Sequence, residues 1–353
     1  MLNTLDSSEV QAWVEEFLEN PQRRYVFGCN EWGADIHQVF GLAGFIDDVV
    51  GELKYCGVPV LRSNEIPHNA MVVSTVVVGR PLTALKKLAE VGANAIDYFA
   101  FYKAQSSKLV GIKYWDGVKP DLSGKSARYL KLRRRLADEE SRRSLDSILQ
   151  FRETFELQHM NGFSDRQQDQ YFETFLKIGP QSVFYDVGAY GGETSVQFAK
   201  RAGNYKEIHV FEPIASTFER ARINLSSFPN VQFHQFGLGA EFGEFSFDVN
   251  GSSSRISAVG AEQCVIRSLD SMQLTPPTII KVDIEGAEME FLAGAIGTLQ
   301  RDKPALAIAC YHNPEHIWEI FDFVTNILPK HDVYLRHYTE GFAETDLFFV
   351  PTS

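Results

Sequence analysis

Hydrophobic residues in the first hundred positions fall in short runs that alternate with amphipathic stretches. The longest run, Ala70–Val78, is rich in β-branched residues, which is typical of a strand buried on both faces of a sheet. In the stretch that follows, Pro81–Val91, apolar residues recur at helical spacing and the proline opens the first turn. Further strands are predicted at Arg24–Gly28, Gly44–Asp48 and Val58–Leu61. This alternation predicts a small parallel α/β domain at residues 1–104.

A polar segment follows at residues 105–176, and its apolar residues also recur at helical spacing. The spacing is clearest at Leu145, Ile148 and Leu149, and it predicts a helical connector. The segment contains a basic run, Lys131–Arg135, with three acidic residues shortly after it. We interpret this run as the solvated face of a helix.

The last part of the chain, residues 177–353, returns to alternating strand and helix patterns. Strands are predicted at Val183–Val187, Glu207–Glu212, Val231–Phe236, Thr278–Asp283, Ala305–Tyr311, Asp332–Tyr338 and Asp346–Val350, with Phe242–Val249 as an extra hairpin arm. Seven strands in this order suit a doubly wound sheet, which binds ligands at the carboxyl ends of its strands.

Composition narrows the class of protein. The chain has 353 residues, enough for two domains, and its formal net charge of −12 lacks the basic excess of a nucleic-acid binder. The four cysteines stand far apart, so neither a zinc site nor a disulfide framework is indicated. The sequence has no run of roughly 18–20 apolar residues and no signal-peptide pattern. We therefore expect a cytoplasmic protein without a membrane span.

The sharpest motif lies where the first strand of the last part ends. Asp186 is followed by a glycine-rich turn with Gly188 and Gly191, and the turn leads into a helix. Glycine lacks a Cβ, so the backbone can approach a ligand closely there. Glu212 ends the next strand, where a carboxylate can accept two hydrogen bonds from a ribose diol. These features predict a cofactor that contains a nucleoside.

Two cofactors compete for this motif. A dinucleotide needs a stricter G-x-G-x-x-G turn, because its pyrophosphate rests on the N-terminus of the helix. Asp186 places a negative charge beside the turn, which disfavours a pyrophosphate and suits the ammonium group of S-adenosylmethionine. S-adenosylmethionine is therefore favoured over a dinucleotide, and a turn that binds nothing is the remaining alternative.

Several segments of the last part share the pattern of one enzyme family. They are Tyr171–Phe172, Asp186–Thr194, Phe211–Pro213, Asn224, Ser252–Ser254, Leu269–Asp270, Lys281–Glu288, Tyr311–His312, Leu335–Tyr338 and Glu344–Thr345. In these segments the chain resembles the FkbM family of methyltransferases, most specifically at Asp283–Glu288. The long N-terminal region departs from the family, whose core does not require it.

The resemblance implies a class I (Rossmann-like) methyltransferase fold and O-methylation of a sugar or polyketide hydroxyl by S-adenosylmethionine. The acceptor is then a carbohydrate or another small molecule with a hydroxyl group. The candidate cofactor contacts are Asp186, Gly188, Ala189, Tyr190, Gly191, Thr194, Glu212, Pro213 and Gly237.

Two candidate catalytic residues follow successive strand patterns. Methyl transfer to a hydroxyl of high pKa needs a base, or a metal that lowers the pKa. Asp283 ends the fourth strand of the last part and His312 follows the fifth, so both reach the cofactor edge of the sheet if these strands are neighbours. We predict that His312 or Asp283 is the general base, with Glu285 and Glu288 orienting it.

Other interpretations of the same residues stay open. Asp283, Glu285 and His312 suit a divalent metal, magnesium or manganese, since carboxylates and one imidazole are ligands for both ions. Glu288 is alternatively an acid favoured by the dipole at a helix start, and His312 a cap of the next helix.

The N-terminal region carries a weaker signal. Gly28 and Gly33 flank a turn after a strand, a place where phosphate groups bind. The region is similar to small Rossmann-like modules of sugar-modifying enzymes, and by that analogy it holds a nucleotide-sugar or a polysaccharide precursor. A scaffold or a homodimer contact is the alternative.

The sequence thus predicts an S-adenosylmethionine-dependent O-methyltransferase. Its acceptor is a hydroxyl of a sugar, nucleotide-sugar, polysaccharide or secondary metabolite. The competing functions are a nucleotide-sugar oxidoreductase or epimerase, and a non-catalytic sugar-binding subunit; both would use the N-terminal domain.

Overall fold

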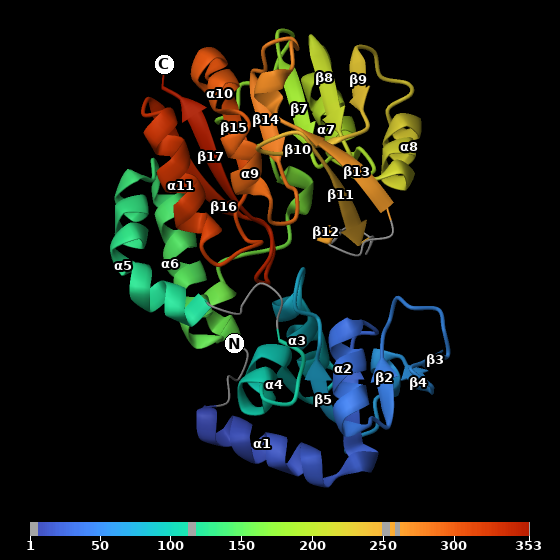
Figure 1. Ribbon diagram of the computed structural model, residues 1–353. Coiled ribbons are helices and arrows are strands. Elements are labelled where there is room, and N and C mark those ends of the chain that lie inside the picture. Colours follow the sequence, from blue (N-terminus) through green and yellow to red (C-terminus); the bar gives the residue numbers. More distant parts are fainter. Residues whose placement is uncertain (1–5, 112–117, 249–254, 258–261, 353) are drawn as a thin grey trace. The chain divides into compact units, whose positions relative to one another are not determined.

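The computed structural model describes residues 6–111, 118–248, 255–257 and 262–352. Its contacts divide the chain into two compact units, which Figure 1 shows coloured along the sequence. The first unit contains residues 1–122, 146–167 and 338–343, and the second contains residues 123–145, 168–337 and 344–353. Two helices, α5 (Val118–Arg135) and α6 (Glu139–Thr154), therefore contribute residues to both units. The predicted domain boundaries at residues 104 and 176 stay a prediction.

The first unit is built around a six-stranded sheet. Its strands are β1 (Arg24–Phe27), β2 (Gly44–Ile46), β3 (Lys54–Tyr55), β4 (Val58–Leu61), β5 (Met71–Ser74) and β6 (Asn94–Asp97). Their order is β3-β4-β2-β1-β5-β6, and only the short pair β3 and β4 is antiparallel. The order reverses at β1, which has β2 on one side and β5 on the other. Such a reversal opens a crevice at the carboxyl ends of the strands.

Four helices accompany these strands: one precedes β1, two connect strands of the sheet, and one follows β6. They are α1 (Ser7–Glu19), α2 (Glu31–Phe40), α3 (Pro81–Glu90) and α4 (Tyr98–Gln105). Helix α1 was not predicted from the sequence, although Asp6 caps it by accepting the backbone N–H groups of Ser8 and Glu9. The predicted strand Ala70–Val78 is shorter in the structure: β5 ends at Ser74 and the chain continues as a loop.

The second unit contains a seven-stranded sheet. Its strands are β7 (Val183–Val187), β8 (Glu207–Phe211), β9 (Val231–His234), β14 (Ile279–Val282), β15 (Ala305–Ala309), β16 (His331–His337) and β17 (Thr345–Pro351). Their order is β16-β17-β15-β14-β7-β8-β9, and β17 runs antiparallel to both of its neighbours. Every residue of β7, β14 and β15 is buried, as expected for central parallel strands. This arrangement confirms the predicted doubly wound, Rossmann-like α/β fold.

A separate four-stranded sheet also belongs to this unit. It consists of β10 (Gly237–Leu238), β11 (Gly243–Asp248), β12 (Arg255–Ser257) and β13 (Glu262–Arg267), in the order β10-β13-β11-β12. The predicted arm at Phe242–Val249 corresponds to β11, whereas β10, β12 and β13 were not predicted. The serine segment Ser252–Ser254 lies outside the described residues.

The helices of the second unit cover the seven-stranded sheet (Figure 1). They are α7 (Glu193–Ala202), α8 (Ala215–Asn224), α9 (Glu288–Ala293), α10 (Ile296–Asp302) and α11 (His316–Ile327). In the basic run on α5, Lys131 is largely exposed and lies 2.6 Å from Asp322 of α11, which agrees with a solvated helix face. Across the described ranges, none of the helices is both long enough and apolar enough to cross a bilayer.

Candidate active site

The reversal of strand order in the second unit brings two loops together. β7 pairs in parallel with β14 on one side and with β8 on the other. Gly188 follows β7 with a φ of 78°, and a Cβ at this position would collide with the carbonyl oxygen of Asp283, which follows β14. Only glycine fits both the backbone angle and this contact. The glycine turn and Asp283 therefore lie against each other.

Asp186 is fully buried at the end of the β7 core, and its charge is balanced inside the protein. One of its carboxylate oxygens lies 3.1 Å from the ammonium group of Lys281, and the other accepts a 2.7 Å hydrogen bond from Ser195. Lys281 also donates to the carbonyl of Gly188 at 2.6 Å. Burial opposes the charge of Lys281, but Asp186 and Asp283 outweigh burial and raise the pKa of this lysine. From the sequence, the negative charge of Asp186 was expected to attract the ammonium group of the cofactor. In the structure this charge pairs with Lys281, and Lys281 in turn holds the glycine turn through Gly188.

Glu212 is buried after β8, beside the same turn. Its Oε2 accepts the backbone N–H of Tyr190 at 2.8 Å, while Oε1 accepts from the N–H of Ile214 and the hydroxyl of Thr217. Burial raises the pKa of Glu212 above its ordinary value. A carboxylate has about four acceptor sites, so these three bonds leave room for a further donor.

The other predicted cofactor contacts surround these two carboxylates. Ala189 and Gly191 are buried in the turn, and Thr194 lies in the first turn of α7. Gly237, in β10, faces Pro213, whose ring carbon would lie 3.6 Å from a Cβ on Gly237. The structure thus places these residues around one edge of the sheet, and their contact with a cofactor stays a prediction.

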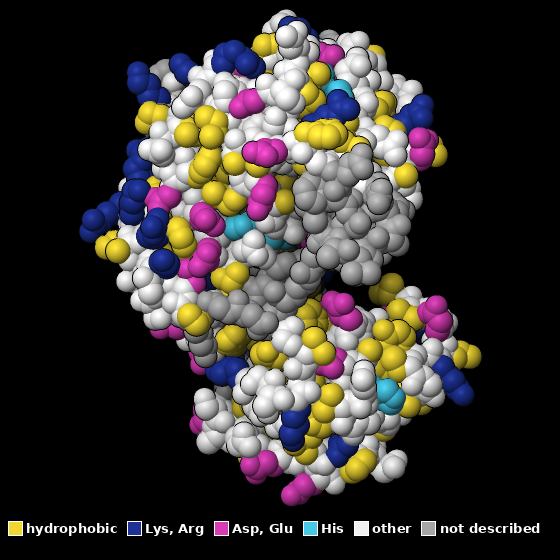
Figure 2. Space-filling view, in the orientation of Figure 1, with side chains coloured by type: hydrophobic (Ala, Val, Ile, Leu, Met, Phe, Trp, Pro, Cys, Tyr) yellow, Lys and Arg dark blue, Asp and Glu magenta, His cyan; other side chains and the backbone are white. Residues whose placement is uncertain are grey.

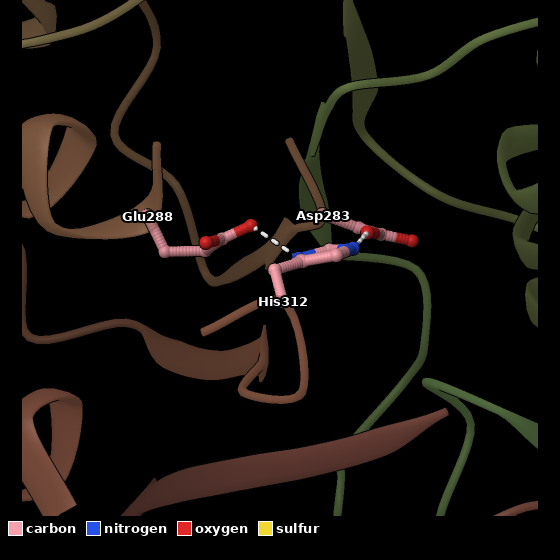
Figure 3. Close-up of side chains that lie close together, drawn as sticks. All are labelled: Asp283, Glu288 and His312. Carbon is pink, nitrogen blue, oxygen red and sulfur yellow. Dashed lines mark hydrogen bonds and ion pairs between the residues drawn. The ribbon is translucent and has the colours of Figure 1, made fainter. Parts of the chain in front are cut away.

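Asp283, His312 and Glu288 form a cluster at the carboxyl ends of β14 and β15 (Figure 3). The ring of His312 lies between the two carboxylates: Nδ1 is 2.9 Å from Oε1 of Glu288, and Nε2 is 3.5 Å from Oδ1 of Asp283. Glu285 lies 3.8 Å from the same Nε2. Glu288, fully buried at the start of α9, also lies 3.0 Å from His316. The structure therefore brings the predicted catalytic residues together.

His312 carries a proton at neutral pH in this environment. Burial disfavours the charged ring, but the charge of Glu288 and the hydrogen bond to it outweigh burial and raise the pKa of His312 to about 9. The same contact holds the pKa of Glu288 far below its ordinary value, against the effect of burial. A protonated imidazole donates hydrogen bonds from both nitrogens and accepts no proton. Asp283 and Glu285, with 24% and 23% of their side chains exposed, are the partners of His312 that reach solvent.

The cluster also has the spacing of a metal site. Donor atoms of Asp283, Glu288 and His312 all lie within 4.8 Å of one another. This group contains Glu288, whereas the sequence analysis named Glu285 as the second carboxylate ligand. A proton and a metal ion compete for the nitrogens of His312, because a ligating imidazole must be deprotonated.

A second group of carboxylates, which the sequence analysis did not assign to the site, lies beside Asp283. Tyr171 donates its hydroxyl to Oδ2 of Asp283 at 2.9 Å, and Gln170 donates to Glu344 and Asp346 at 2.8 and 3.0 Å. Burial, together with neighbouring negative charges, raises the pKa of Glu344 to about 7 and that of Asp346 well above its ordinary value. Because β17 runs antiparallel to β15, the first residues of β17 lie at the edge where the parallel strands end. Looking in the sequence only for residues at the carboxyl ends of strands therefore misses Glu344 and Asp346.

Glutamine at position 344 is expected to flatten the pH dependence of stability. The pKa of Glu344 rises from 4.5 to about 7 on folding, so the folded state binds this proton more tightly than the unfolded chain. The resulting stability is complete below about pH 4.5 and is lost as the pH rises through about 7. The Tm of the wild type should therefore fall between about pH 5 and pH 8, and fall less in Glu344→Gln. Glu219→Gln, an exposed substitution on α8, is the control; equal slopes in all three proteins would contradict this assignment.

Comparisons with known sequences bear on the second unit. Residues 186–335 match the family described as the methyltransferase FkbM domain. A curated relative, the hexuronic acid methyltransferase AglP of Haloferax volcanii, is 28% identical over 131 residues, and the match covers 33% of this chain and 52% of that protein. The chain thus spans about half the length of this relative.

A solved structure has a similar fold over nearly the whole chain. The crystal structure of methyltransferase FkbM from Methylobacillus flagellatus KT has a TM-score of 0.75 and 22% sequence identity, and the match covers 96% of this chain and 93% of that one. At this identity the structural match shows a similar fold in both units. The match to the FkbM domain of methyltransferases is limited to residues 186–335 of this chain.

Proposed function

We propose that this protein transfers a methyl group from S-adenosylmethionine to a hydroxyl group of a sugar. The observation that carries the proposal is the position of Asp283. Its backbone contacts the glycine turn, and its carboxylate is held by the hydroxyl of Tyr171 and faces His312. The family of residues 186–335 supports methyl transfer, and the hexuronic acid methyltransferase relative supports a sugar acceptor.

The residues around the turn fit the proposed cofactor. Glu212 is a fixed, buried carboxylate that can accept from a ribose diol. The charge of Asp186 is balanced by Lys281. The negative charge that favours a sulfonium ion therefore comes from Asp283 and Glu285. When bound, S-adenosylmethionine supplies an electrophilic methyl group.

Asp283 is the general base in this proposal. Its carboxylate accepts the proton of the acceptor hydroxyl, so that the oxygen becomes a nucleophile. Tyr171 and the charged His312 hold the carboxylate in one orientation, and Glu288 keeps the proton on His312. His312 is thus a positioning residue rather than the base.

A labelled-methyl transfer assay tests the proposal. The full chain is incubated with S-adenosylmethionine and a panel of neutral oligosaccharides, uronic-acid-containing oligosaccharides and nucleotide-sugars. Label is expected in at least one sugar. If S-adenosylhomocysteine binds but no sugar is labelled, the acceptor class is wrong; if S-adenosylhomocysteine does not bind, the whole proposal fails. Parallel reactions with a chelator test whether methyl transfer requires a metal ion. An unchanged rate would show that no metal is required, and a loss of rate that magnesium or manganese restores would show that one is.

Glutamine at position 212 is expected to weaken S-adenosylhomocysteine binding by about 10–100-fold. The substitution removes the charge that strengthens hydrogen bonds from a ribose diol, while the amide oxygen still accepts from Tyr190. Isothermal titration calorimetry measures the change in Kd. The control is Glu219→Gln on the exposed face of α8, which should bind like the wild type. Wild-type affinity in Glu212→Gln would mean that the ribose binds elsewhere.

A further inference from the structure

The first unit contains its own cavity, with a volume of about 420 Å³. It is formed by the loops after β1, β2 and β5, the three strands at which the strand order reverses. The lining residues are Gly28–Trp32, Asp47 and Thr75–Gly79, all within this unit. Open parallel sheets bind ligands at such a reversal, and the volume suits a small molecule.

The loop after β1 has two of the three glycines of a dinucleotide-binding turn. Gly28 has a φ of 115°, and a Cβ on Gly33 would lie 2.9 Å from the side chain of Val26, so both positions need glycine. The middle position holds Asn30, which accepts the N–H of Gly33 at 3.0 Å and donates to the carbonyl of Thr75 at 2.8 Å. Its side chain stands where a pyrophosphate would approach the backbone.

The cavity is acidic. Among the residues that line it, Glu31 and Asp47 are charged and none is a lysine or an arginine. Glu31 lies in the first turn of α2, where its charge offsets the attraction of the helix dipole for an anion. A ligand without phosphate therefore fits better than a nucleotide or a nucleotide-sugar.

Asp47 repeats the geometry of Glu212. Its Oδ2 accepts the N–H of Cys29 in the turn after the first strand at 2.9 Å, as Oε2 of Glu212 accepts the N–H of Tyr190. In both residues the other carboxylate oxygen accepts two hydrogen bonds from residues that follow within five positions of the chain. Each unit thus holds a carboxylate after its second strand, fixed by the turn after its first strand and with acceptor capacity left for a diol.

Trp32 adds an apolar face to the cavity. Its ring is half-buried and tilts against Tyr98, with the ring centroids 5.4 Å apart. Flat aromatic rings pack well against sugar rings and bases. We propose that this cavity binds a neutral ring with a vicinal diol, either the ribose of a nucleoside or a sugar unit, and that Asp47 accepts hydrogen bonds from the diol. The inference does not depend on methyl transfer in the second unit.

Ligand-observed NMR titration of the full chain tests the inference. The chain carries Glu212→Gln, so that the ribose acceptor of the second unit is removed. The probes are adenosine, 2′-deoxyadenosine, AMP and methyl α-mannopyranoside. The diol-containing probes should saturate, 2′-deoxyadenosine should bind about tenfold more weakly than adenosine, and AMP should also bind more weakly. Tighter binding of adenosine identifies a nucleoside ligand, and tighter binding of the mannoside identifies a sugar.

Two variants locate the binding in the first unit. Asp47→Asn should lose about tenfold in affinity, and Val78→Trp, at an exposed lining residue, should block the cavity without touching the carboxylate. Circular dichroism melting checks that both variants fold. The inference is overturned if 2′-deoxyadenosine or AMP binds as tightly as adenosine, or if Val78→Trp binds normally. It also fails if no probe saturates up to about 10 mM.

Discussion

Replacing Asp283 with asparagine should reduce kcat for methyl transfer by about 10²–10⁴-fold. Asparagine keeps the size of the side chain and an oxygen that accepts from Tyr171, but it removes the carboxylate that takes the acceptor proton. The change is measured with the labelled-methyl assay under saturating S-adenosylmethionine. Binding of S-adenosylhomocysteine should change little, since Asp283 acts on the acceptor.

Two comparisons make this prediction specific. His312→Gln should lower kcat less than Asp283→Asn, because it removes a positioning contact and leaves the base in place. Glu219→Gln, on the exposed face of α8, should have wild-type kcat. Full turnover in Asp283→Asn with normal Kd for S-adenosylhomocysteine would remove Asp283 from the mechanism.

Replacing Lys281 with methionine should lower the free energy of unfolding by about 3–5 kcal/mol. Lys281 and Asp186 are both buried and 3.1 Å apart, so the substitution leaves the charge of Asp186 without its partner. It also removes the hydrogen bond to the carbonyl of Gly188. Urea unfolding measures the change, and weaker S-adenosylhomocysteine binding should accompany it because the turn loses this support.

The double variant Asp186→Asn with Lys281→Met provides the control. An asparagine can still accept from Ser195 and carries no charge, so much of the lost stability should return. If the single and double variants are equally unstable, the loss comes from packing around Lys281 rather than from the unpaired charge.

Most strands of the seven-stranded sheet could be predicted from the local pattern of hydrophobic residues. The strand patterns at β7, β14 and β15 were predicted correctly, and every residue of these three strands is buried, including the charged Asp186 in β7 and Lys281 in β14. The local pattern was misleading after Ser74, because the run of β-branched residues continues beyond the end of β5. These residues form an apolar loop that lines the cavity of the first unit. It missed α1, whose capping box at Asp6 was a readable signal.

The sequence by itself determined which residues stand at strand ends, and hence that Asp186, Glu212, Asp283 and His312 are candidates for one site, since parallel strands end at a common edge. Only the tertiary structure decided their charge states. Asp186 is neutralised by Lys281, and His312 keeps its proton because of Glu288. Likewise, only the antiparallel pairing of β17 brings its first residues to the edge, and Tyr171 meets Asp283 across 112 positions of sequence. Charge and proton affinity depend on burial and on partners distant in the chain, which no local pattern records.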